Sequence, residues 1–266
     1  MTPRILTIAG SDSGGGAGIQ ADLKTITALG GFGMSAVTAL TAQNTMGVRG
    51  IYPVSAEFVA AQIDAVAEDI GVDAGKTGML AGRAVVEVVA ERVKRHGIRP
   101  LVVDPVMAAK SGDALLEKGA RAALRDMLLP LATVVTPNLA EAEAFSGVEV
   151  RDRDAMSEAA RRVRELGPEW VLVKGGHLEG DPVDVLFNGQ DFHEVRRPRV
   201  RTTSTHGTGC TYASAIATGL AYGLGVLEAV EWARDAVQAG LEGGLQIGHG
   251  AGPLDHGALF RLARPG

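Results

Sequence analysis

Short apolar runs alternate with amphipathic stretches along most of the chain. Residues 5–9 form the first apolar run, and residues 19–29 follow as a helical stretch after a glycine-rich turn. Short apolar runs that end in turn residues are typical of buried strands, and apolar positions three or four apart are typical of helices. Further strands are predicted for residues 34–42, 52–54, 74–77, 101–103, 133–135, 171–173, 183–187 and 192–195. Further helices are predicted for residues 55–70, 84–95, 153–166, 210–224, 227–245 and 254–262.

This alternation predicts an α/β protein with a central, mostly parallel sheet and helices on both faces. Residues 183–195 are expected to form a hairpin around Asn188-Gly189, and residues 52–54 a short edge strand. Ser55 is expected to cap the helix that follows it. The apolar face of that helix is expected to comprise Phe58, Val59, Ile63, Val66 and Ile70. No linker, low-complexity segment or repeat interrupts the pattern, so residues 1–266 are predicted to form a single domain.

Polar or glycine-rich motifs follow several predicted strands directly. In open α/β sheets, ligands bind at the carboxyl ends of the strands. We therefore expect these motifs to converge at one edge of the sheet, opposite the helix that starts near Cys210. The motifs are residues 10–18, Gln43, Met79, Asp104, Asn138 with Glu141, and Lys174.

The stretch from His206 to Thr211 is the strongest candidate for chemistry. Gly207, Thr208 and Gly209 lead into a small-residue helix, and the first-turn N–H groups of a helix have no partner inside it. The helix dipole adds partial positive charge, which makes the position an anion site. A thiol at such an end is expected to have a lowered pKa, so Cys210 is a candidate base. The alternative is a glycine-rich turn with a buried structural cysteine.

The glycine-rich turn at residues 10–18 also indicates phosphate binding, and two known motifs can be tested against it. A P-loop is excluded because no Gly-Lys-Ser/Thr closes the turn. A dinucleotide fingerprint matches at residues 16–21, but it requires an acidic residue about 20 positions later. No Asp or Glu occurs from Leu23 to Ala56, so NAD binding is disfavoured.

The other polar residues at strand ends each have a structural alternative. The amide of Gln43 offers donors and an acceptor that fit an aminated heterocycle, although the residue taken alone favours a surface turn. Asp104 is a candidate for a Mg²⁺ or phosphate environment, or a residue that caps a loop. Asn138 and Glu141 form a capping box, and the same first turn suits a Mg²⁺-phosphate group. Residues 108–113 are small and polar, which suits a mobile lid.

Composition and charge exclude several classes of function. The chain has 266 residues, 46% of them hydrophobic, and a net charge of −5, so nothing points to nucleic acid or to an anionic membrane. One cysteine excludes an internal disulfide, and no apolar run approaches the ~20 residues that span a bilayer. The start shows no signal-peptide pattern, so a cytoplasmic protein is expected.

Several motifs together resemble the hydroxymethylpyrimidine/phosphomethylpyrimidine kinases of the ribokinase-like superfamily. The resemblance spans essentially the whole chain, in order, although no single motif is specific. Its motifs are residues 9–22, Thr41-Ala42-Gln43-Asn44-Thr45, Lys76-Thr77-Gly78-Met79-Leu80, Asp104-Pro105-Val106-Met107, Ala109-Lys110-Ser111-Gly112, Thr136-Pro137-Asn138-Leu139, Lys174-Gly175-Gly176-His177 and His206-Gly207-Thr208-Gly209-Cys210. Ala140 and Thr77 depart from the common pattern, and neither touches the chemistry.

The resemblance implies a ribokinase-like kinase that uses ATP and Mg²⁺, usually as a homodimer. The reaction would convert 4-amino-5-hydroxymethyl-2-methylpyrimidine (HMP) to its phosphate and then to its diphosphate, for thiamine synthesis. Gln43 would bind the aminopyrimidine. Its pocket would be lined by Gly10, Asp22, Met79 and Val106.

For the phosphates, the resemblance implies that residues 207–210 form the anion hole, with Cys210 in the position of the base. Asn138 and Glu141 would organise Mg²⁺ and phosphates, and Lys174 would meet the nucleotide. Thr208 would contribute to the nucleotide site as part of the anion hole. Two alternatives stay open: a pyridoxal or pyridoxine kinase of the same superfamily, and a non-catalytic pyrimidine-binding regulator.

Overall fold

The computed structural model describes residues 1–108, 119–176, 178, 180–262 and 264–265. Most of the predicted lid, including Lys110, and the predicted motif residue His177 therefore lie outside the described residues. Within the described part of the chain, no helix is long and apolar enough to span a membrane.

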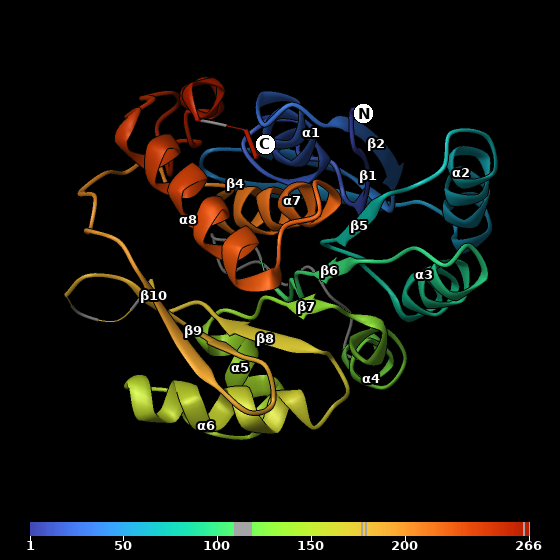
Figure 1. Ribbon diagram of the computed structural model, residues 1–266. Helices are drawn as coiled ribbons and strands as arrows, with labels where there is room; N and C mark the ends of the chain where they lie inside the picture. The colour runs from blue at the N-terminus through green and yellow to red at the C-terminus, as the bar shows by residue number, and fades with distance from the viewer. Residues whose placement is uncertain (109–118, 177, 179, 263, 266) are drawn as a thin grey trace.

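An eight-stranded sheet runs through the middle of the protein, in the order β10-β9-β8-β7-β6-β5-β1-β2 (Figure 1). The six strands from β2 to β8 are parallel, whereas β9 is antiparallel to β8 and to β10. The expected mostly parallel sheet and the C-terminal hairpin are thus confirmed. The strands are β1 (Arg4–Ala9), β2 (Phe32–Val37), β5 (Ala74–Thr77), β6 (Leu101–Val103), β7 (Val134–Val135), β8 (Trp170–Val173), β9 (Val183–Phe187) and β10 (Phe192–Arg196).

Helices cover both faces of the sheet, as Figure 1 shows. Successive strand residues point to opposite faces, so Val102 packs with one helical layer and Val103 with the other. The first layer comprises α1 (Gly18–Ala28), α7 (Thr208–Ala221), α8 (Val226–Glu242) and a 3₁₀ helix (His256–Arg261). The second comprises α2 (Ala56–Asp69), α3 (Arg83–Arg95), α4 (Ala120–Ala123), a π-helical turn (Leu124–Leu128), a 3₁₀ turn (Leu129–Leu131), α5 (Leu139–Ser146) and α6 (Arg153–Arg164).

The single strand predicted for residues 34–42 is wrong, because the chain leaves the sheet at Thr38. The Thr38 hydroxyl is buried and donates to the carbonyl of Met79 at 2.6 Å, which turns the backbone away after β2. The next residues form β3 (Ala39–Asn44), which pairs with β4 (Gly47–Pro53) in a separate antiparallel ribbon. The predicted edge strand at residues 52–54 is the end of β4 and does not join the main sheet. Gln43 therefore lies on this ribbon and not on a strand of the main sheet.

Smaller differences concern individual helices. Ser55 caps α2 as predicted, but Phe58 is 63% exposed, because the buried face of α2 is formed by Val59, Ala60 and Ile63. The predicted helix at residues 254–262 is a shorter 3₁₀ helix. The helical turns at residues 120–131 were not predicted.

A buried ion pair joins the sheet to the first helical layer. Nζ of Lys76, on β5, lies 2.8 and 2.9 Å from the two carboxylate oxygens of Asp22, on α1, and neither side chain has any exposed surface. Thr7 of β1 donates to the same carboxylate at 2.6 Å, and Ser214 of α7 donates at 2.8 Å. Burial disfavours the charged ammonium, but the carboxylate of Asp22 outweighs this and raises the pKa of Lys76 above its ordinary value. Side chains from β1, β5 and α7 thus all bind the carboxylate of Asp22 on α1.

We expect Lys76→Met to lower the free energy of unfolding by about 3–5 kcal/mol, because it leaves a buried carboxylate without its cation. Urea unfolding followed by circular dichroism measures the change. The matched control is Arg83→Met, which breaks an exposed pair between Arg83 and Glu87 and should cost under about 1 kcal/mol. Equal losses in the two variants would contradict a structural role for the buried pair.

Candidate active site

The carboxyl ends of β6, β7 and β8 bring together the predicted acidic and basic residues. Nζ of Lys174 lies 2.8 Å from Oδ1 of Asp104, which also accepts a hydrogen bond from Thr136 at 3.1 Å. Lys174 and Asn138 are paired in a short bridge between the two strand ends. A Cβ placed on Gly209 would lie 3.4 Å from Nζ of Lys174, so the start of α7 contacts the same cluster. The expected convergence of these motifs is confirmed.

The start of α7 has the geometry of an anion site. Gly207 caps the helix with φ of +84°, a left-handed conformation that favours glycine. A side chain there would also collide with the carbonyl oxygen of Gly16, so the anion-hole residues and the glycine-rich turn are packed together. The hydroxyl of Thr208 donates to the carbonyl of Thr205 at 2.7 Å and holds the turn before the helix.

Asp12 organises the glycine-rich turn from inside. Its carboxylate is 2% exposed and accepts backbone hydrogen bonds from Gly14, Gly16 and Ala17 at 2.8, 3.0 and 2.8 Å. Oδ2 also lies 3.0 Å from Nε2 of His206. Burial raises the pKa of Asp12, but these hydrogen bonds outweigh it and hold the pKa below its ordinary value. The turn is therefore built around an ionised carboxylate.

The expected lowering of the Cys210 pKa is wrong for the protein without ligands. Desolvation by the surrounding protein raises the pKa of the thiol to about 11. Lys76 lowers it, and a hydrogen bond from the backbone N–H of Gly18 does so too, but Asp22 and Asp104 oppose them. A helix start lowers a thiol pKa only where burial and nearby carboxylates do not outweigh it. Burial therefore favours the neutral thiol over the thiolate.

Asn138 and Glu141 form the predicted capping box at the start of α5. Oδ1 of Asn138 accepts from the backbone of Glu141, and Oε2 of Glu141 accepts from the backbone of Asn138, both at 2.9 Å. Glu141 is 5% exposed. Burial raises its pKa to about 7, with Lys174 opposing the shift and Asp104 adding to it. Carboxylate and hydroxyl oxygens are the ligands Mg²⁺ prefers, so Asp104, Glu141 and Thr136 fit a metal-phosphate group.

Three of the residues expected to line a substrate pocket lie together. Met79 and Val106 pack with Ala39 and Ala81 in a small apolar cluster separate from the two main cores. Gly10 contacts it, because a Cβ there would lie 3.1 Å from Sδ of Met79. Ala81 has φ of +61°, a strained conformation for a residue with a side chain.

Gln43 and Asp22 occupy different positions from that cluster. Gln43 lines a neighbouring pocket of about 220 Å³ that residues 44–47, His206, Gly250 and Ala251 complete. Asp22 is fully buried with both oxygens bound, so it supports the site from within the protein. Contact of either residue with a substrate stays a prediction.

Asp12, His206 and Lys76 were given no role from the sequence, although all three lie in motifs quoted above. The available signal was a charged or titratable side chain inside each motif. Their partners are distant in sequence: Asp12 and His206 are 194 positions apart, and Lys76 and Asp22 are 54 apart. Local spacing therefore could not assign them.

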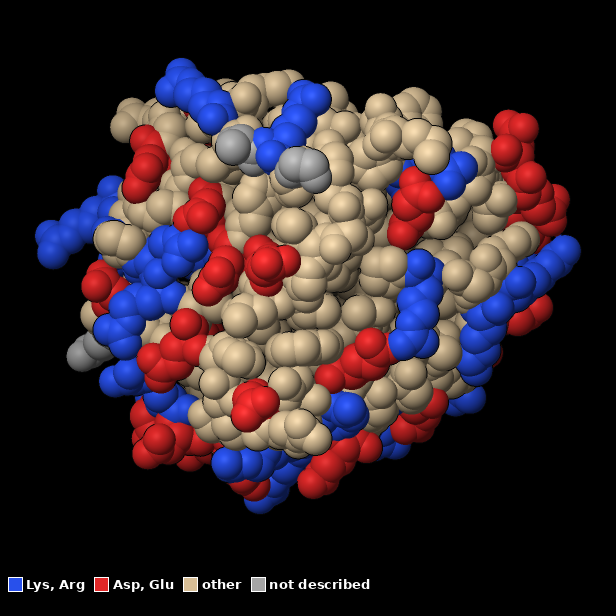
Figure 2. Space-filling view, in the orientation of Figure 1, with Lys and Arg blue, Asp and Glu red and all other residues tan. Residues whose placement is uncertain are grey.

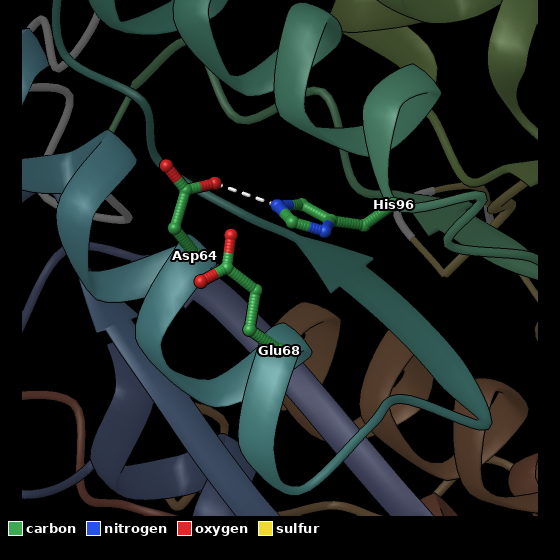
Figure 3. A group of neighbouring side chains, drawn as sticks. All are labelled: Asp64, Glu68 and His96. Atoms are coloured by element: carbon green, nitrogen blue, oxygen red, sulfur yellow. Dashed lines mark hydrogen bonds and ion pairs between the residues drawn. The ribbon is translucent and has the colours of Figure 1, made fainter.

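Another cluster of possible metal ligands lies away from this site (Figure 3). Asp64 and Glu68 of α2 face His96 at the end of α3, with Nε2 of His96 2.6 Å from Oδ1 of Asp64. Arg92 lies 2.9 Å from Asp64, and Arg95 lies 3.5 Å from Glu68. A metal ion would have to displace these guanidinium groups. We interpret the cluster as an ion-pair network that ties α2 to α3.

Acidic and basic side chains are mixed on the surface of the protein and do not form a patch of one sign on the face shown in Figure 2. Figure 2 shows acidic and basic residues interleaved around the rim of one face, with a broad area without charge at its centre. The charges that define the site are instead buried at the ends of the strands.

The sheet order and the glycine-capped start of α7 define an α/β protein of the ribokinase-like class. The chain superposes with a TM-score of 0.92 on the ADP complex of Bacillus subtilis pyridoxal kinase, at 38% identity and over 98% of this chain and 100% of that one. The sequence profile of the phosphomethylpyrimidine kinase family matches residues 12–255. The chain belongs to this family.

Two relatives show the same similarity at the sequence level. A hydroxymethylpyrimidine/phosphomethylpyrimidine kinase of Streptomyces coelicolor is 52% identical over 255 residues, which cover 96% of this chain and 94% of that protein. A thiamine biosynthesis bifunctional protein of Geobacter sulfurreducens is 52% identical over 253 residues. The match covers 95% of this chain but only 52% of that longer protein.

We expect Glu141 to make the stability of the protein depend on pH. A carboxyl whose pKa is about 7 in the folded state and 4.5 in the unfolded state holds its proton more tightly when folded. Stability is therefore lost as pH rises from about 4.5 to 7, by up to about 3 kcal/mol. Glu141→Gln keeps an acceptor for the Asn138 N–H but does not titrate.

The measurement is urea unfolding at pH 5, 6, 7 and 8 in metal-free buffer. Groups away from the site titrate in the same way in both proteins, so the difference between wild type and Glu141→Gln reports this carboxyl together with its neighbours Lys174 and Asp104. The variant should become progressively more stable than wild type as pH rises. A constant difference between the two would show that Glu141 is not buried with a raised pKa.

Proposed function

We propose that this protein phosphorylates HMP to HMP phosphate, and HMP phosphate to HMP diphosphate, with ATP as the phosphoryl donor, in thiamine biosynthesis. One observation carries the proposal: a glycine-capped helix start lies against a largely buried lysine that is paired with a carboxylate, and a small apolar cluster includes Val106, two residues after that carboxylate. Membership of the phosphomethylpyrimidine kinase family supports the choice of substrate. A binding protein without catalysis has no need for all three parts.

Each part has a role in phosphoryl transfer. The N–H groups at residues 207–210 face the charge that develops on the transferring phosphoryl, where fixed donors are most effective. Lys174 meets the phosphates of the nucleotide, and its present partner Asp104 keeps the ammonium in place. The apolar residues around Met79 hold the pyrimidine ring and exclude water from it.

We propose that the metal is Mg²⁺. Bound with the nucleotide, it would offset the negative charge of the phosphates. Asp104 and Glu141 would hold it, directly or through water, with Asn138 fixing the orientation of Glu141. Binding of a cation requires Glu141 to lose the proton that burial favours.

Cys210 stands in the position of the base. A thiol with a pKa of about 11 has to be deprotonated before it can accept a proton from the substrate alcohol. Lys76 is the nearby cation that favours the thiolate. The proposal includes a homodimer, as the family resemblance implies, and a cytoplasmic location, as the sequence pattern indicates.

The test is release of ADP in a coupled assay with Mg-ATP and four acceptors: HMP, HMP phosphate, pyridoxine and ribose. We expect turnover with HMP and with its phosphate, and at most weak turnover with the others. A preference for pyridoxine would favour the pyridoxal-kinase alternative, to which the similarity with the Bacillus subtilis structure draws attention. Binding of HMP without turnover would leave only a ligand-binding function.

We expect Cys210→Ala to lower kcat for HMP by ~10²–10⁴-fold while HMP affinity is nearly retained, the usual effect of losing a general base. Because the thiol pKa is about 11, kcat of the wild type should rise with pH between 7 and 9. The variant should lose this rise. A wild-type rate that is flat over the same range would show that Cys210 orients the hydroxyl and does not accept its proton.

We expect one active site to perform both phosphorylations, since the described residues provide one anion hole with one candidate base. HMP phosphate should therefore inhibit the first step competitively with HMP. Its phosphate already carries a charge of about −1.5 to −2 near pH 7 and depends less on a base. Cys210→Ala should thus impair the first step more than the second. Non-competitive inhibition, with both steps impaired equally, would indicate two sites.

A further inference from the structure

The side chain of His206 connects three parts of the site. The residue immediately precedes the anion hole, and its ring is 12% exposed. Nε2 lies 3.0 Å from Oδ2 of Asp12 in the glycine-rich turn and 3.4 Å from the amide nitrogen of Gln43 on the β3–β4 ribbon. One imidazole nitrogen therefore faces both a carboxylate and the proposed pyrimidine-binding amide.

The Asp12 carboxylate determines which ring nitrogen carries the proton. It already accepts three backbone N–H groups, which favour its ionised form. An ionised carboxylate can only accept hydrogen bonds, so Nε2 of His206 must carry a hydrogen and donate it to Asp12. Nε2 consequently has no lone pair to offer Gln43.

This assignment fixes the orientation of the Gln43 amide. With the amide nitrogen facing His206, two N–H donors oppose each other at 3.4 Å. The other end of the amide lies 3.2 Å from the hydroxyl of Thr41, which donates to the carbonyl of Ser11 at 2.9 Å and still has lone pairs. A half-turn of the amide removes this contact between donors. The amide oxygen then shares the Nε2–H of His206 with the closer Asp12 carboxylate, and the amide nitrogen can donate to Thr41.

We propose that His206 is a positioning residue that sets the order of donor and acceptor on the Gln43 amide, and so selects a 4-aminopyrimidine over its 4-oxo analogue. The inference rests on the proposed function. In the orientation that His206 imposes, one N–H and one oxygen lone pair of Gln43 remain for the ligand. They match a ring nitrogen beside an amino group. A 4-oxo pyrimidine presents the reverse order and requires the amide to turn its nitrogen back against the His206 N–H.

The backbone of His206 is held independently of its ring. Its N–H donates to Gly252 at 2.9 Å, and its carbonyl accepts from Leu254 at 3.3 Å. Substitutions of the ring therefore leave the backbone contacts of the anion hole in place.

The experiment compares His206→Phe, which keeps an aromatic ring without donors, with His206→Gln, which restores an N–H donor. The affinity for HMP and for its 4-oxo analogue is measured by calorimetric titration, and kcat and KM by ADP release. Loss of one buried polar partner is worth roughly 5- to 150-fold. We expect His206→Phe to reduce discrimination between the two ligands by at least about tenfold, mainly through weaker HMP binding and with a much smaller change in kcat. His206→Gln should recover most of the discrimination.

A double-mutant cycle with Gln43→Ala tests whether His206 acts through Gln43. If it does, His206→Phe should add nothing to the loss of discrimination already caused by Gln43→Ala. Additive losses, or a kcat defect without loss of discrimination, would overturn the proposal and leave a structural role for the ring. Absence of HMP phosphorylation by the wild type would refute the proposed function instead, so the two failures are distinguishable.

Discussion

The arrangement of the site depends on the fully buried pair between Lys76 and Asp22. Removing an ammonium and a carboxylate from water is costly, and only good geometry with further hydrogen bonds offsets the cost. Here Thr7 and Ser214 supply those hydrogen bonds, so β1, β5, α1 and α7 must meet in one geometry. Ser214 lies one helical turn after Cys210. The pair therefore fixes the end of α7 at which the anion hole is built, and it does so from inside the protein.

Other buried carboxylates of the site are also paired with groups from distant segments. Asp12 is satisfied by backbone N–H groups and His206, and Asp104 by Lys174 and Thr136. Each buried carboxylate thus joins segments from different parts of the chain. Glu141 differs from these carboxylates, because burial raises its pKa to about 7. Near neutral pH, Glu141 can be either protonated or ionised beside Lys174. It is therefore suited to bind a cation that enters the site only together with the nucleotide.

The sequence was sufficient to predict the elements of the sheet and the residues at its edge, because hydrophobic periodicity and turn residues are local signals. Asp104, Asn138, Glu141 and Lys174 converge as expected for strand ends. The break at Thr38 could not be predicted, because the hydrogen bond that turns the chain goes to Met79, 41 positions away. The pKa of Cys210 could not be predicted for a similar reason, since the burial that raises it, and the carboxylates of Asp22 and Asp104 that add to this, come from other elements. Local patterns predict which groups are present, whereas distant contacts decide their charge and orientation.

The pairing of the two ends of the chain has a consequence for synthesis. The backbone of Ala251 donates to Thr45 at 3.1 Å, and His206 reaches back to Asp12 across 194 positions. A ribosome releases residues in order, and domains generally fold as units during synthesis. Until residues 206–214 have emerged, a nascent chain lacks both His206 for its glycine-rich turn and Ser214 for the buried carboxylate of Asp22. Completion of the site is therefore tied to the last 61 residues of the sequence, and chains that stop before them cannot form it.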